Sequence, residues 1–130
     1  MIRIASFLLA LAVIMGAFGA HALKSRLTPE SLTVWKTAVE YHFYHALGLL
    51  VVSLLLKVNV ITAGTSKWVS NLLLSGILLF SGSLYLLSTK SILAWDPSFL
   101  GPITPIGGLL FIAGWVLLAL KANVHSVKQK

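Results

Sequence analysis

The sequence predicts an all-α membrane protein, a four-transmembrane-helix bundle with up-down-up-down topology. Of its 130 residues, 58% are hydrophobic and only 10% are charged, whereas about a quarter of the residues in ordinary globular domains are charged. The apolar residues form four runs of about 20, each long enough to cross a hydrocarbon core about 30 Å thick as a helix. None alternates polar and apolar residues as a barrel strand would, and short links make successive helices antiparallel. We therefore expect one integral membrane domain over residues 1–130.

The first predicted helix covers residues 4–23. Gly16 and Gly19 would give it a small-residue face suited to close helix packing. An alternative interpretation is a secretory signal peptide, because Arg3 precedes the apolar run and residues 20–22 resemble an A-x-A cleavage site. The run before that triplet is longer than a usual signal-peptide core, which favours a retained helix.

Lysines mark the ends of the other three predicted helices, as is typical of headgroup regions. These helices cover residues 37–56, 68–88 and 103–120. The flanking lysines are Lys36, Lys57, Lys67, Lys90 and Lys121. Five glycines in the third and fourth helices are expected to allow close helix approach: Gly76, Gly82, Gly107, Gly108 and Gly114.

The net charge of +7 is interpreted as a signal of membrane topology. The basic residues lie between apolar runs, so the expected partner is the lipid bilayer and not nucleic acid. One side of the membrane would hold Arg3, Lys57, Lys67, Lys121, Lys128 and Lys130. The other would hold Lys24, Arg26, Lys36 and Lys90, together with the acids Glu30 and Asp96. The excess of basic residues on the first side predicts that both termini are cytoplasmic.

Polar residues inside the apolar runs are concentrated in one membrane half, and we call them the predicted polar cluster. Its members are His21, Glu40, Tyr41, His45, Ser81, Ser83, Tyr85 and Thr104. Polar groups are costly in lipid, so such a set often marks an ion or proton site. The alternative is structural, with these groups pairing to one another and bridging helices at a modest gain in stability.

Metal binding and nucleophilic catalysis have little support in the sequence. His42 and His45 stand three residues apart on a helix, but no third ligand is fixed by local spacing. The chain has no cysteine, and Ser81 and Ser83 are not part of a nucleophile motif. We therefore expect no metal, no cofactor and no enzyme activity.

Several segments in order along the chain resemble the YgdD/YwdK family of small four-helix inner-membrane proteins, a domain of unknown function. They are residues 16–23, 35–41 with 45–46, 79–85, and 104–108 leading to 113–115. The resemblance implies a retained first helix and a location in the bacterial plasma (inner) membrane. His21, Glu40 and His45 match the family pattern, in which Gln often replaces His42, and this disfavours a two-histidine metal site. The family brings no established activity.

Two functional hypotheses follow, with a third ranked below them. The first is a non-enzymatic membrane protein that supports membrane integrity or a partner complex, as a homo-oligomer or with another membrane protein. The second is a small proton, ion or solute transporter or channel subunit that uses Glu40 and His45, and four helices per chain would then require an oligomer. The third is a membrane enzyme acting on lipid or quinone.

Overall fold

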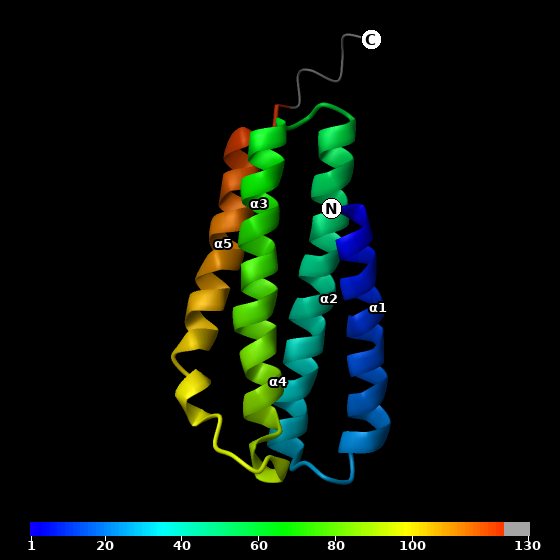
Figure 1. Cartoon of the computed structure of the whole chain (residues 1–130), viewed down its shortest axis with the longest axis vertical. Coiled ribbons are helices and arrows are strands. Elements are labelled where there is room, and N and C mark those ends of the chain that lie inside the picture. Colours follow the sequence, from blue (N-terminus) through cyan, green and yellow to red (C-terminus); the bar gives the residue numbers. More distant parts are fainter. Residues whose placement is uncertain (124–130) are drawn as a thin grey trace.

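The computed structural model describes residues 1–123 and shows a bundle of helices (Figure 1). Four helices are long and apolar enough to cross a membrane: Ile2–Leu23, Pro29–Lys57, Ala63–Ser88 and Ser98–Lys121. Successive helices run in opposite directions, and none of the described residues forms a strand. The predicted all-α bundle of four membrane-spanning helices is confirmed.

The first and third spans each contain a π-helical turn. The elements are α1 (Ile2–Phe18) with the π turn Gly19–Leu23, α2 (Pro29–Lys57), α3 (Ala63–Gly76) with the π turn Ile77–Ser81, α4 (Gly82–Ser88), the 3-10 turns Lys90–Ile92 and Ser98–Leu100, and α5 (Ile103–Lys121). The third span runs without a break from α3 through the π turn into α4, so four spans arise from five α-helices.

Two helices begin earlier than their apolar runs because polar caps extend them. α2 begins at Pro29, where the missing proline N–H costs nothing in a first helical turn. The Thr28 hydroxyl accepts a hydrogen bond from the Ser31 N–H at 3.2 Å, which satisfies one of the unpaired donors of that turn. Thr62 caps α3 in the same way. These first turns are polar, so hydropathy alone places the starts of α2 and α3 too late.

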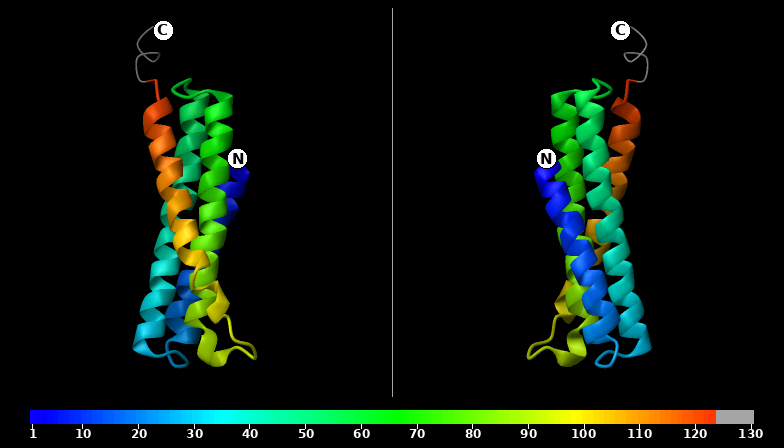
Figure 2. Two further views of the ribbon diagram at one scale, coloured as in Figure 1. Left: turned by 90° about the vertical axis from the view of Figure 1, so that its left-hand side faces the viewer. Right: turned by 90° about the vertical axis from the view of Figure 1, so that its right-hand side faces the viewer.

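The helices are arranged so that α1 and α5 lie on opposite sides of the bundle (Figures 1 and 2). α1 packs along α2, α5 packs along α3, and α2 packs against the third span between them. The main core includes Leu49, Leu73 and Phe111. A second, smaller cluster of Leu23, Leu27 and Trp35 lies where α1 ends.

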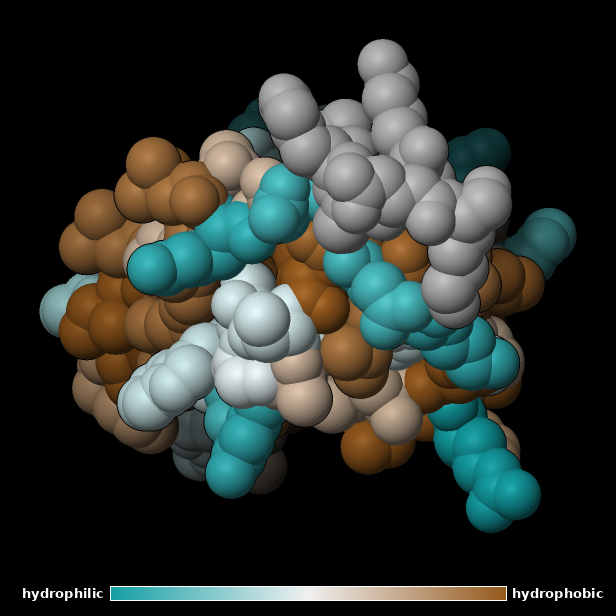
Figure 3. All heavy atoms as spheres, turned by 90° about the horizontal axis from the view of Figure 1, so that it is seen from above, coloured by the Kyte–Doolittle hydropathy of each residue, from teal (hydrophilic) through white to brown (hydrophobic). Residues whose placement is uncertain are grey.

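The outer surface of the bundle is apolar along its flanks and polar at its ends. Large side chains such as Phe7, Leu78 and Leu120 are exposed on the flanks. Seen from the end where α2 connects to α3, hydrophilic side chains extend over the end of the bundle, while the flanks are hydrophobic (Figure 3). A contiguous apolar surface of this extent is rare on soluble monomers and fits contact with lipid tails.

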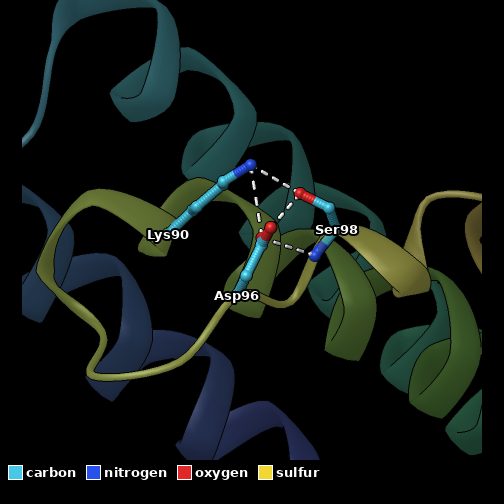
Figure 4. Close-up of polar contacts among 3 residues, drawn as sticks. All are labelled: Lys90, Asp96 and Ser98. Atoms are coloured by element: carbon cyan, nitrogen blue, oxygen red, sulfur yellow. Dashed lines mark hydrogen bonds and ion pairs between the residues drawn. The ribbon is translucent and has the colours of Figure 1, made fainter.

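The connection between α4 and α5 is ordered by a small polar network (Figure 4). The Asp96 carboxylate accepts hydrogen bonds from the Ser98 N–H at 3.0 Å and the Ser98 hydroxyl at 2.6 Å. Lys90 Nζ lies 3.2 Å from the same carboxylate oxygen and donates to Ser98 Oγ at 2.6 Å. The hydrogen bonds from Ser98, together with Lys90, lower the pKa of Asp96 below its ordinary value.

Candidate functional site

The structure divides the predicted polar cluster among separate places. His45, Ser81 and Ser83 are buried, Tyr85 and Thr104 are partly accessible at the margins of the core, and Tyr41 is exposed. Glu40 and His21 lie on the exposed surface of the bundle. The cluster is therefore not one continuous site.

His45 is held in an aromatic stack between α2 and α5. Its ring lies parallel to that of Phe111, with centroids 3.4 Å apart and planes inclined by 15°, and its side chain is only 7% exposed. His45 Nδ1 lies 2.7 Å from the carbonyl oxygen of Tyr41. A carbonyl can only accept, so Nδ1 carries the hydrogen and donates it. This arrangement fixes the ring orientation and suits a packing role.

His42 pairs with Tyr85 across the interface between α2 and α4. His42 Nδ1 and the Tyr85 hydroxyl are 3.2 Å apart, and the Tyr85 ring packs on Trp35 with centroids 4.8 Å apart. His42 Nε2 is buried and has no partner in hydrogen-bonding geometry. The pairing is missed by the sequence pattern, because the two residues stand on different helices.

A pair of hydroxyls connects α4 to α5. Ser83 Oγ donates to the carbonyl oxygen of Phe80 at 2.9 Å and lies 2.7 Å from Thr104 Oγ1. Ser83 has one hydroxyl hydrogen, so Thr104 must donate to Ser83 when Ser83 donates to Phe80. The neighbouring Ser81 is fully buried, and its hydroxyl has no hydrogen-bond partner.

Glu40 lies on the outer face of the bundle. This corrects the sequence-based prediction, which placed the acid inside the bundle. The reason is the rotational phase of α2. Ala38 and His42 point into the core, and Glu40 is two positions from each, which is about 200° around a helix. Hydropathy could not reveal this phase, because apolar residues cover both the inner and the outer faces of α2.

A shallow groove of about 190 Å³ lies beside Glu40 on the surface between α1 and α2. Its lining residues are Gly16, Gly19, Ala20, Trp35, Lys36, Val39 and Glu40. The Trp35 indole N–H crosses this contact and donates to the Met15 carbonyl oxygen at 3.0 Å. An added Cβ at Gly19 would overlap the Trp35 ring, so Gly19 makes room for that ring. By sequence position Trp35 is expected in the interfacial tryptophan belt, but in the structure it is only 4% exposed and packs between helices.

The other predicted packing glycines differ in how closely their neighbours approach. A Cβ at Gly76 would overlap the Phe111 ring, and one at Gly107 would overlap the backbone of Phe80. A Cβ at Gly16 would be in ordinary contact with Val39. A Cβ at Gly114 would be in tight contact with Leu73 and close to Leu72. Gly108 faces the Phe80 ring at ordinary contact distance, and a Cβ at Gly82 would meet only the Ile77 carbonyl oxygen, 4.0 Å away. Gly82 instead lines a groove that is described below.

Metal-ligating side chains do not gather anywhere in residues 1–123. No three His, Cys, Asp or Glu residues of this part of the chain lie close enough to hold a metal ion. His42 and His45 point to different helices, with His42 on Tyr85 and His45 on Phe111. The described residues therefore offer contacts between helices and surface grooves as their candidate sites.

Comparison with known proteins gives membrane proteins without an assigned activity. The family model described as "Protein of unknown function (DUF423)" matches residues 15–108. The UPF0382 membrane protein YwdK of Bacillus subtilis (strain 168) is 48% identical over 114 residues, which cover 86% of each chain. A UPF0382 membrane protein of Staphylococcus haemolyticus is 45% identical over 105 residues, which cover 81% of this chain and 80% of the relative. No solved structure matches this chain. The resemblance to YwdK seen in the sequence motifs is confirmed.

Proposed function

We propose that this chain, which belongs to the DUF423 family of proteins of unknown function, is a non-catalytic membrane protein that assembles with a second copy of itself through the outer face of α1 and α2. The observation that carries this proposal is the exposed position of Glu40 within the second span. An acidic side chain facing lipid is costly, up to about 2.5–3.5 kcal/mol at the middle of a span. A partner that pairs with the carboxylate would remove that cost.

Lys36 supplies the matching charge on the same surface. Lys36 and Glu40 are one helical turn apart, are both exposed, and line the same groove. The ion pair found among residues 1–123 is Lys90–Asp96, so Lys36 and Glu40 do not form one within the chain. A surface that carries both charges is complementary to itself. A two-fold axis through this face would bring Lys36 of each copy to Glu40 of the other.

Small residues on α1 support close approach at the same place. Gly16, Gly19 and Ala20 line the groove beside the two charges, and small residues allow membrane helices to approach closely. The interior polar groups are consistent with a non-catalytic role, because they contact other helices of the same chain. His45 stacks on Phe111 and Ser83 bonds to Thr104, so both already act in packing between helices.

Cross-linking in membranes tests this assembly, because the chain has no cysteine of its own. Ala20→Cys places a single thiol beside the groove, and we expect it to give a cross-linked species of twice the chain mass. Leu109→Cys is the matched control, since Leu109 is 65% exposed on α5, on the opposite side of the bundle from α1. Equal yields from the two positions, or a cross-link to a protein of another mass, would overturn assembly with a second copy.

Charge exchange tests the part played by Lys36 and Glu40. We expect Lys36→Glu and Glu40→Lys each to reduce the Ala20→Cys cross-link by several-fold, because each change brings like charges together. The double variant Lys36→Glu/Glu40→Lys restores opposite charges across the two-fold axis and should recover the cross-link. Failure of the double variant to recover it, with the fold intact, would contradict reciprocal pairing.

Transport is the competing function, and it makes a different prediction for Glu40. Protein reconstituted in liposomes would carry a proton or cation flux that Glu40→Gln abolishes if Glu40 conducts ions. The assembly proposal expects no flux from the wild type or from Glu40→Gln. A flux that depends on Glu40 would replace assembly with transport as the function of this acid.

We place the chain in the bacterial plasma membrane with both termini in the cytoplasm. Support for the membrane type comes from the bacterial relatives, whose names describe membrane proteins. The described basic residues are evenly divided, with Arg3, Lys57, Lys67 and Lys121 on one side and Lys24, Arg26, Lys36 and Lys90 on the other. The orientation therefore depends on Lys128 and Lys130, which lie outside the described residues.

A further inference from the structure

Two grooves meet at Tyr85 on the side of α1 that faces α4. One, of about 450 Å³, includes Arg26, Phe18 and Thr89 in its walls. The other, of about 340 Å³, lies deeper in the span and includes Leu11, Leu78 and Gly82. Tyr85 lines both, so the two grooves adjoin at this residue, and together we call them the α1–α4 cleft.

The cleft exists because α1 packs chiefly along α2 and leaves its flank toward the third span uncovered. Gly82 deepens it, since a Cβ there would meet only the Ile77 carbonyl oxygen, 4.0 Å away. Its walls are mostly aliphatic and aromatic. Two of the polar groups nearby already have partners, with the Trp35 N–H on Met15 and the Tyr85 hydroxyl on His42. His42 Nε2, on a residue that lines the inner groove, has none. Such walls suit a hydrocarbon chain better than a polar solute.

The outer mouth of the cleft carries a cation with no acidic partner. Arg26 follows the last turn of the first span, where its N–H donates to the Leu23 carbonyl oxygen at 2.9 Å, and its side chain is exposed. It has no ion pair with any acid of residues 1–123, where the pair found is Lys90–Asp96. Guanidinium groups bind phosphate through two parallel hydrogen bonds.

The length of the cleft matches one leaflet of a bilayer. From Thr89 at the outer groove to Ile77 at the inner one, the third span rises about 18 Å at about 1.5 Å per residue. Half of a hydrocarbon core is about 15 Å thick. An acyl chain with its headgroup at the level of Arg26 would therefore lie along the cleft and end near Ile77.

We infer that the α1–α4 cleft is a binding site for one phospholipid, with the phosphate on Arg26 and an acyl chain between α1 and the third span. The lipid would fill a gap that no side chain fills and would pair a cation that the chain leaves unpaired. This site does not use Lys36 or Glu40, so it stands independently of the proposed assembly face.

Native mass spectrometry of the detergent-solubilised full chain tests this inference with two probes, dioleoylphosphatidylglycerol and dioleoylglycerol. The two lipids have the same chains, but only the first has a phosphate. We expect one phosphatidylglycerol to be retained per chain, and Arg26→Gln to weaken that retention by about tenfold, since one charge-assisted contact is lost. Dioleoylglycerol retention should not change in this variant.

Three further variants make the test specific. Lys24→Gln removes an exposed cation that does not line the cleft, and we expect phosphatidylglycerol retention to stay within about twofold of wild type. Gly82→Leu fills the inner groove and should weaken retention of both lipids, whereas Gly64→Leu, an exposed change near the start of α3, should weaken neither. Equal losses from Arg26→Gln and Lys24→Gln, or no loss from Gly82→Leu, would overturn the site.

Discussion

At Gly107 the backbone of α5 comes so close to the third span that no larger residue fits. A Cβ there would overlap the backbone of Phe80, which cannot move aside as a flexible side chain can. Gly82 lies in the same part of the bundle, but a Cβ there would meet only the Ile77 carbonyl oxygen, at an uncrowded 4.0 Å. The two glycines look alike in sequence and differ only in what the neighbouring helix presents to them.

We predict that Gly107→Ala and Gly82→Ala have opposite effects on stability. Gly107→Ala should lower the free energy of unfolding by about 1–3 kcal/mol, because the crowded backbones must separate. Gly82→Ala should raise it by about 0.5–1 kcal/mol, since alanine loses less conformational entropy in a helix. Thermal unfolding of both variants in the same detergent measures the difference, and a Gly107→Ala variant as stable as wild type would contradict the close approach.

At the scale of elements, α4 and α5 are joined by a loop whose order depends on a charged acid. Asp96 accepts two hydrogen bonds from Ser98 and lies beside Lys90. These contacts favour the ionised carboxylate and lower the pKa of Asp96. The folded-state pKa of Asp96 therefore lies below its unfolded-state pKa of about 3.9. The ionised carboxylate stabilises the loop fully above the unfolded-state pKa, and this stabilisation is lost as the pH falls through the folded-state pKa.

We therefore predict that the loop between Lys90 and Ser98 is equally protected at pH 7 and pH 5 and loosens only below about pH 4. Asp96→Asn should loosen it at pH 7 while the bundle stays folded. Amide hydrogen exchange at Ser98 measures the protection. Glu30→Gln, at the start of α2, is the control and should leave exchange at Ser98 unchanged. Loosening that begins near neutral pH would assign the effect to another group.

At the scale of the whole molecule, the predicted orientation can be tested at its two ends. Ser66 is a natural choice for labelling by sequence, but the structure buries it, so Gly64, which is exposed, replaces it. Exposed Ala94 reports on the opposite end. We predict that a membrane-impermeant thiol reagent added to intact cells modifies Ala94→Cys and not Gly64→Cys, with both modified after lysis. The reverse pattern would invert the orientation.

The sequence by itself determined the protein class, the four spans and the residues that flank them. These features depend on composition and run length, because lipid requires about 20 apolar residues per helix whatever their neighbours are. The family motifs likewise lie in the linear order of residues. Hydropathy did not give the first turns of α2 and α3, since their caps at Thr28 and Thr62 are polar.

Only the tertiary structure decided which face of each helix points inward. In a soluble helix the polar side reveals the exposed face, but lipid-facing and core-facing sides are both apolar here, so the sequence carried no such signal for α2. Packing turned His42 and His45 inward and Glu40 outward. It also formed the α1–α4 cleft beside Arg26. The residues predicted as one polar cluster became separate contacts because each helix has its own rotation, which is set by the helices packed against it.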